Sequence, residues 1–185
     1  MSFVVVYDAC VLYPNTLRDL LIRIGQAGLV QAKWTEDILN EVTRNIQANL
    51  PDVAPEKLER LRTLMNGSIR DCLVKGYEPL IEAVKLPDPN DRHVVAAAIR
   101  ARAQMIVTSN LKDFPSDSLA AWDIEAQGPD HFVLAQIELN QQAVYGAVQR
   151  IADSRRNPPC TVEDVLRELE RSGLVASATA LRTVR

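Results

Sequence analysis

The first residues of the chain form a run of apolar side chains that stops at a carboxylate. The stretch FVVV, residues 3 to 6, leads through Tyr7 into Asp8, and CVL at residues 10 to 12 is apolar again. A short, continuous, valine-rich run is typical of a strand buried on both faces of a parallel sheet. The pattern predicts a strand at about residues 3 to 7, with Asp8 at its carboxyl end.

Apolar positions at helical spacing predict helices in the rest of the first half. One helix starts near Pro14, where proline is well tolerated, and ends at Gly28. Thr35 is placed to cap the next helix, and a break at 49–55 precedes a third helix from Glu56 to about Cys72. The stretch 76–85 fits neither the helical nor the strand pattern.

The middle of the chain combines helix signals with short strand signals. Asp88 is a good N-cap and Pro89 fits the first helical turn, so LPDPNDRHVVAAAIRARA predicts a helix to about Ala103. A buried strand at 105–108, a helical turn at 116–121 and a weak strand at 122–126 are expected to follow. Strands that alternate with helices predict an α/β fold with a parallel sheet and helical crossovers.

From residue 130 onward the pattern is helical. Apolar residues at helical spacing run from Leu134 to Ile151, and residues 155–159 form a polar linker that contains proline. Thr161 is placed to cap a last helix that ends at Gly173, and the tail adds a turn. We expect a core domain at 1–130 and a helical extension at 131–185 that packs on it.

Composition indicates an ordinary globular protein. The 185 residues are 47% hydrophobic and 24% charged, which suits a domain with a substantial core. Apolar stretches fall short of the roughly 20 residues that a membrane helix needs, and the N-terminus lacks the pattern of a signal peptide. Three widely spaced cysteines show neither a disulfide framework nor a zinc motif. We expect a cytoplasmic protein.

The formal net charge of −3 argues against wholesale coating of nucleic acid, but it leaves room for a local basic rim. A solvated surface is the simpler role for most of the basic residues. The candidates for such a rim are Arg18, Arg23, Lys33, Arg44, Arg92, Arg155 and Arg156.

Acidic residues recur where the elements of the predicted sheet would meet. Asp8 follows a strand, Glu41 lies in the helix capped by Thr35, Asp91 lies at the start of a helix, and Asp113 follows the 105–108 strand. Carboxylates that converge repel one another unless a cation neutralises them or they take up protons. Ligand sets made only of oxygen suit Mg²⁺ or Mn²⁺, and such a cluster suits hydrolysis of phosphodiesters.

Each acid also has a structural explanation. Asp8 can bond backbone amides of the following loop, and the helix dipole alone favours an acid at the position of Asp91. An isolated Glu41 can be a solvated helix edge, and Asp113 can close the turn in NLKDFP. Taken singly, these residues leave both interpretations open.

Three segments together resemble the PIN-domain nucleases, in particular the toxin-type ribonucleases related to VapC. They are VVVYDACVL, ILNEVTRNI and DPNDRHVVAAAIRARAQMIVTSNLKDFP, and the resemblance covers roughly residues 1 to 130. It implies a parallel-sheet α/β/α sandwich and a metal-dependent endoribonuclease that uses Mg²⁺ or Mn²⁺. It also implies an RNA substrate, a cognate antitoxin that blocks the active-site groove, and often a homodimer.

The acidic positions of the family fall on Asp8, Glu41 and Asp91, but the next one holds Asn110. The nearest acid is Asp113, so the fourth metal ligand is open between these two residues. Three charges suffice for one divalent ion, and we expect one tightly held ion and at most a weak second. Thr108, Ser109 and Asn15 are candidate supporting residues, although each also fits a turn.

Other functions fit the sequence less well. A HAD-type phosphatase needs an acid where Cys10 stands, a receiver domain needs an acidic pair that is missing, and no nucleotide-phosphate loop is found. His93 and His131 are not spaced as a metal pair, and His93 is interpreted as a polar helix residue. The alternative from another class is a catalytically weak or inactive RNA-binding or regulatory module, which Asn110 favours and the three retained acids disfavour.

Overall fold

A single four-stranded parallel sheet forms the centre of the molecule, whose computed structural model describes residues 2–184. The strand order is β2-β1-β3-β4. The strands are β1 (Phe3–Tyr7), β2 (Val30–Lys33), β3 (Met105–Val107) and β4 (Glu125–Gln127). The predicted α/β fold with a parallel sheet is therefore confirmed. Because β2 and β3 lie on opposite sides of β1, the strand order reverses between β1 and β3.

Two strands differ from the sequence prediction. The sequence pattern did not predict β2, because only Val30 and Ala32 of its four residues are buried and the apolar signal is short. The last strand starts at Glu125, later than the predicted 122, because Asp123 adopts a left-handed conformation (φ 54°) within a turn. Both elements lie at the edges of the sheet, where burial on only part of the strand weakens the pattern.

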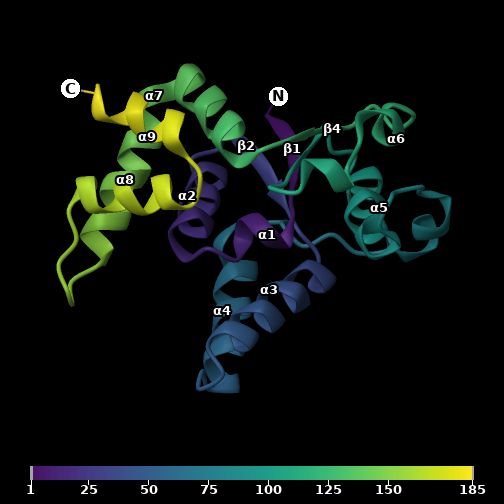
Figure 1. Cartoon of the computed structure of the whole chain (residues 1–185), viewed down its shortest axis with the longest axis horizontal. Helices are drawn as coiled ribbons and strands as arrows, with labels where there is room; N and C mark the ends of the chain where they lie inside the picture. Colours follow the sequence, from purple (N-terminus) through teal and green to yellow (C-terminus); the bar gives the residue numbers. More distant parts are fainter. Residues whose placement is uncertain (1, 185) are drawn as a thin grey trace.

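Helices cover both faces of the sheet, as Figure 1 shows. One face carries α2 (Asn15–Gln26) and α7 (Pro129–Ser154), and the other carries α5 (Arg92–Ala101). The ring of Tyr7 on β1 meets the ring of Phe132 on α7 edge to face, with centroids 5.9 Å apart. The Tyr7 hydroxyl is also satisfied, since it donates to the Leu21 carbonyl at 3.1 Å. The strand that precedes Asp8 is thus fixed by α2 and α7.

The α5 helix is buried on all sides along one stretch. Residues 94–98 (VVAAA) are fully buried, because the sheet covers one side of α5 and η1 (Glu78–Ala83) packs on another. This 3₁₀ helix lies within the stretch 76–85, whose pattern fitted neither a helix nor a strand. Asp88 caps η2 (Pro89–Asp91), a single 3₁₀ turn, and α5 begins only at Arg92. It ends at Ala101, close to the predicted end.

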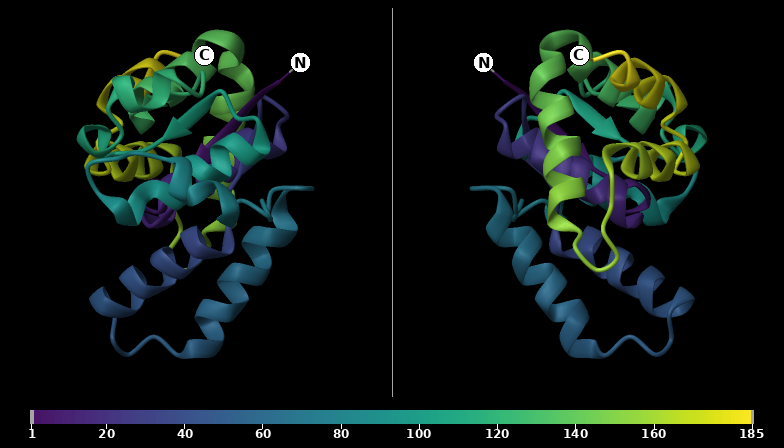
Figure 2. Two further views of the ribbon diagram at one scale, coloured as in Figure 1. Left: turned by 90° about the vertical axis from the view of Figure 1, so that its right-hand side faces the viewer. Right: turned by 90° about the vertical axis from the view of Figure 1, so that its left-hand side faces the viewer.

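An arm made of α3 (Glu36–Asn49) and α4 (Pro55–Ser68) extends away from the sheet, with the connection 50–54 at its far end (Figure 2). The predicted cap of α3 is confirmed, since the Thr35 hydroxyl accepts a hydrogen bond from the Ile38 amide at 3.0 Å. The α4 helix ends earlier than predicted. Its last residue is followed by extended backbone that brings Leu73 beside Trp34, at the edge of the sheet.

The shorter elements complete the chain. They are α1 (Ala9–Leu12), η3 (Leu111–Asp113), α6 (Ser116–Ala120), α8 (Val162–Arg171) and α9 (Val175–Arg182). Thr161 begins α8 with a full capping box, as predicted, and α9 is longer than the predicted turn. Asn140 interrupts α7 with non-helical backbone angles. Within residues 2–184, no helix has the length and apolar character that crossing a membrane requires.

Candidate functional site

The candidate site lies beyond the carboxyl ends of β1 and β3, where the strand order reverses. Crevices at this place in open α/β sheets are where ligands bind. Asp8 and Thr108 directly follow the paired residues Tyr7 and Val107, so the sheet register brings them side by side. The Asp8 amide donates to the Val107 carbonyl at 3.1 Å, which continues the ladder one residue past the strand.

The carboxylate of Asp8 is held from both sides. One oxygen, Oδ1, accepts from the Ala9 amide and the other, Oδ2, accepts from the Thr108 hydroxyl, each at 2.8 Å. The Asp8 side chain is buried, with 4% of the residue exposed. Burial raises the pKa of Asp8, the hydrogen bonds from Thr108 and Ala9 lower it, and the charge of Glu41 raises it further, with a net upward shift.

Cys10 forms part of the wall beside this carboxylate. Its sulfur lies 3.4 Å from Asp8 Oδ2 and 3.4 Å from the Thr108 hydroxyl, and it accepts from the Ser109 amide at 3.3 Å. Burial and the charge of Asp8 raise the pKa of Cys10 to about 11, so the thiol stays protonated at neutral pH. It acts as a weak donor to Asp8 and adds no negative charge to the site.

Glu41 reaches the site from α3 and is paired with a histidine. Its Oε1 lies 2.7 Å from His93 Nε2, and about a third of the Glu41 side chain is exposed. Burial lowers the pKa of His93, but the hydrogen bond and the charge of Glu41 outweigh burial, so that the net shift is upward. The other ring nitrogen, Nδ1, is buried without a hydrogen-bond partner within residues 2–184.

Asp91 lies between η2 and α5, and the charges of the other acids contribute to its raised pKa. Its pKa is raised to about 6, first by burial and then by the charges of Asp8, Asp88, Asp113 and Glu41. Such Coulombic effects need short separations. Asp91 and Glu41 also line one polar cleft of about 500 Å³, together with Asp37, Asn40, Arg44, Asn45, Asn90 and His93.

The remaining candidates lie around the rim. The backbone amide of Asn110 donates to the Thr108 hydroxyl at 3.1 Å, whereas Ser109 and Asn110 are exposed. Asp113 ends η3 and is partly buried. Asn15 is exposed, and its Oδ1 accepts from Arg18 Nη2 at 2.9 Å. Arg18 also donates to the Leu12 and Tyr13 carbonyls, so it fixes the turn between α1 and α2.

The donor set has the chemistry of a site for a hard divalent cation, although the acids do not form a closed ligand shell. Within residues 2–184, no group of three or more His, Cys, Asp and Glu side chains is arranged to hold a metal ion. Asp8 bonds Thr108 and Glu41 is turned onto His93. Burial first, and then the charges of neighbouring acids, raise the pKa values of Asp8 and Asp91, and a bound cation would oppose both effects.

Sequence reasoning missed the contribution of His93. It was interpreted as a polar residue of a helix, and its partner Glu41 lies 52 positions away in the sequence. The usable signal was its place two residues after Asp91. A helix that starts at the candidate site directs the side chains of its first turn toward that site.

Comparisons with known proteins place the chain in a family. The PIN domain family model matches residues 4–112, more than half of the 185 residues. A second family model, described as the VapC50 C-terminal domain, matches residues 129–183. No solved structure was found to match the chain.

A curated protein of Mycobacterium tuberculosis (strain ATCC 25618 / H37Rv), named "Putative ribonuclease VapC50", is 43% identical over 91 residues. The match covers 49% of this chain and 53% of that protein, so it spans about half the length of the relative. It is the match over residues 4–112, on the sheet that carries Asp8, that identifies the chain as a member of the PIN-domain family.

Proposed function

We propose that this protein is a divalent-metal-dependent endoribonuclease that hydrolyses phosphodiester bonds of RNA. The observation that carries the proposal is the placement of Asp8. It is a buried carboxylate at the switch point of the sheet, oriented by Thr108. Its charge is one of those that, after burial, raise the pKa of Asp91 to about 6. Family membership and the printed name of the M. tuberculosis relative support the same reaction.

The chain's own residues would orient the ligands of one cation. The Ala9 amide and the Thr108 hydroxyl fix the plane of the Asp8 carboxylate, which leaves its remaining lone pairs for a ligand. His93 holds Glu41 by a hydrogen bond from the far side of the cleft, which sets the direction of that carboxylate. Asp91 completes the set from the start of α5, and Asp113 with Asn110 lies at the rim.

A phosphodiester is an anion, so these acids alone would repel the substrate. When bound there, Mg²⁺ or Mn²⁺ supplies Lewis-acid polarisation of the phosphate and a lowered pKa for an attacking water. The acids would hold that charge in place beside the polar cleft that Glu41 and Asp91 line.

The same resemblance extends the proposal to the toxin of a toxin–antitoxin pair. The match of a VapC50 C-terminal domain model to residues 129–183 supports it, because both parts of the chain then match models of related proteins. A cognate antitoxin, a homodimer and a cytoplasmic location belong to this proposal. Co-expression of a cognate antitoxin should suppress cleavage, and light scattering on the purified chain measures its oligomeric state.

The decisive experiment is cleavage of total RNA with Mg²⁺ or Mn²⁺, with the cut sites mapped, by the wild type and by Asp8→Asn. The matched control is Asp153→Asn, which removes an exposed carboxylate from α7. We expect metal-dependent cuts from the wild type and the control, and none from Asp8→Asn. A metal-dependent rise in thermal midpoint in the wild type measures binding apart from catalysis.

RNA binding without cleavage at any concentration of either metal would contradict the proposal. That result would favour the non-catalytic RNA-binding or regulatory module. Cleavage that persists in Asp8→Asn at the wild-type rate would show that the activity resides elsewhere or in a contaminant.

A further inference from the structure

A groove lined by arginines runs between the end of α7 and α8, outside the acidic site. We name it the arginine groove, and its volume is about 760 Å³. Its basic residues are Arg155, Arg156, Arg167 and Arg171, and its acidic residues are Asp164 and Glu168. In a chain with a formal net charge of −3, this is a local concentration of positive charge.

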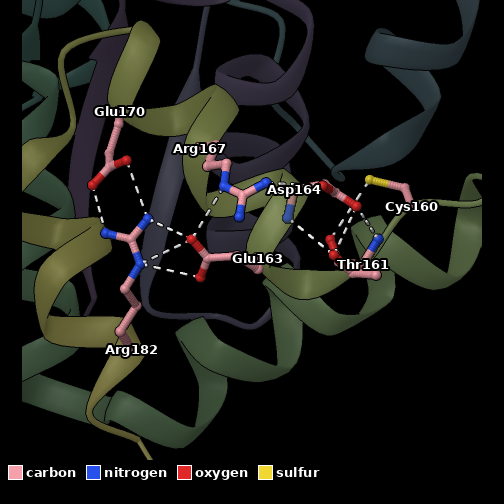
Figure 3. A network of polar contacts seen from close by, with 7 residues as sticks. All are labelled: Cys160, Thr161, Glu163, Asp164, Arg167, Glu170 and Arg182. Atoms are coloured by element: carbon pink, nitrogen blue, oxygen red, sulfur yellow. Dashed lines mark hydrogen bonds and ion pairs between the residues drawn. The ribbon is translucent and has the colours of Figure 1, made fainter.

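The two acids of the groove are already engaged. Asp164 accepts hydrogen bonds from the Thr161 amide and hydroxyl in the capping box of α8, as Figure 3 shows. Glu168 is bound by Arg155 at 2.7 Å and also accepts from Thr16 on α2. These contacts use Arg155 to fasten α8 to α2, so Arg155 forms the floor of the groove and not its binding surface.

The other arginines of the groove remain available to a ligand. Arg156 and Arg171 are exposed and form no ion pair with any carboxylate of residues 2–184. Arg167 lies 3.5 Å from Glu163 and 3.7 Å from Asp164, and 60% of its side chain is exposed. Figure 3 shows its guanidinium between these two acids. Loose pairs of this kind are weak and exchange readily for a better anionic partner.

The groove adjoins the segment that carries the catalytic candidate. Asn15 lines the groove, and it follows α1, the short helix that Asp8 caps. Figure 1 shows α2 between α1 and α8, and α2 contacts both helices. Asn15, the first residue of α2, therefore connects the segment that follows Asp8 to the groove.

We propose that the arginine groove binds the phosphate backbone of single-stranded RNA next to the cleavage site. The inference rests on the proposed function, and it adds to it the surface that holds the substrate. Guanidinium groups match phosphates by bidentate hydrogen bonds, and polyanions gain affinity from every phosphate neutralised. The lining offers no large aliphatic or aromatic side chain, which disfavours an apolar protein anchor.

The test is a binding measurement without cleavage. A labelled single-stranded RNA of ~16 nucleotides is titrated in EDTA at several salt concentrations and followed by fluorescence anisotropy. The variant is the double substitution Arg156→Gln with Arg171→Gln. We expect ~10-fold weaker binding at low salt and a salt slope lower by ~1.4, since each lost phosphate contact contributes ~0.7.

The matched control is Arg70→Gln with Arg102→Gln. It removes the same charge from exposed positions near the amino ends of the strands, opposite to the site. The control should bind RNA with the same salt dependence as the wild type. The double variant Arg156→Lys with Arg171→Lys, which keeps both positive charges, should do so too. Equal slopes for the groove variant and its control would overturn the inference. So would a groove variant that loses inhibition by an antitoxin while it binds RNA normally.

Cleavage with Mg²⁺ separates this inference from the proposed function. A wild type that cuts no RNA refutes the nuclease proposal. The salt dependence of RNA binding still tests, independently, whether the arginine groove binds RNA. If the wild type cuts RNA and the groove variant has the same slope and rate as the control, the nuclease stands and the inference on the groove fails.

Discussion

Carboxylates in two regions of this molecule have opposite surroundings. On α8, Glu163 and Glu170 flank Arg182 of α9, with contacts of 2.9 and 2.5 Å, and these hydrogen bonds lower the pKa of both acids (Figure 3). At the end of β1, burial and neighbouring acids raise the pKa values of Asp8 and Asp91. The charged form of a carboxylate is therefore stabilised in one region and destabilised in the other.

The difference separates a structural role from a functional one. Glu163 and Glu170 of α8 are partly exposed and each has Arg182 as a basic partner, so their charges tie α9 to α8. The neighbours of the acids near Asp8 are other acids, the Thr108 hydroxyl and His93. An arrangement that costs stability is typical of a functional site, where a ligand supplies the missing charge.

The largest effect is expected from Asp8→Asn. The change removes the charge and little volume, so cleavage should fall on the order of 100-fold or more. Thermal stability without metal should stay equal or rise, because a buried charge is lost while the Ala9 amide keeps an acceptor. Melting curves in EDTA and RNA cleavage measure the two effects. A large loss of stability with retained activity would instead assign Asp8 a capping role.

Glu41→Gln should reduce metal affinity and cleavage together, each by ~10–100-fold. His93→Leu should give a smaller loss in both, because it removes the hydrogen bond that orients Glu41 and leaves the ligand in place. Isothermal calorimetry with Mn²⁺ provides the affinity. Unchanged Mn²⁺ affinity in Glu41→Gln would place Glu41 outside the metal site.

Variants at the rim of the site test how much each acid contributes. Asp113→Asn should cost less activity than Asp91→Asn, since Asp113 lies in η3 at the edge of the cluster. Asn110→Asp should tighten a weak second ion and raise activity at low Mn²⁺. Calorimetry that finds two equally tight ions in the wild type would disprove the single-ion arrangement, as would equal damage from Asp113→Asn and Asp91→Asn.

The raised pKa of Asp91 predicts how metal-free stability depends on pH. Because the folded pKa of about 6 exceeds the ordinary value of 3.8, the folded state binds more protons between these values, and stability falls as pH rises through this window. Asp91→Asn removes this loss of stability at higher pH. It should be more stable than the wild type by roughly 1 kcal/mol at pH 7, after discounting for solvent screening, and show no such gain below pH ~4. Urea unfolding in EDTA at both pH values tests the sign.

The smallest effect is expected in the other region of the comparison, where α9 pairs with α8. Arg182→Gln breaks the contacts to Glu163 and Glu170, but all three side chains lie at the surface and are partly exposed, and such surface pairs contribute little. Thermal stability should fall less than in any core variant, and metal affinity should not change. A large change in metal affinity would mean that α9 acts on the acidic site.

Several features could be predicted from the sequence because they depend on residues close together. The Thr35 cap of α3 and the capping box at Thr161 rest on contacts within four residues, and the valine run of β1 is a continuous local pattern. The end of α5 was predicted almost correctly for the same reason. The edge strand β2 was missed because its short pattern, VQAK, carries little apolar signal, and its place beside β1 depends on pairing across the sheet.

The sequence by itself determined that the chain forms a parallel α/β sheet and that acids follow its strands and start its helices. Only the tertiary structure decided which of these acids interact. The register of β1 and β3 joined Asp8 to Thr108, and the placement of α5 beside α3 joined His93 to Glu41. Those contacts span 100 and 52 residues, and side-chain periodicity carries no information over such distances. Local patterns fix elements, whereas packing fixes which side chains meet.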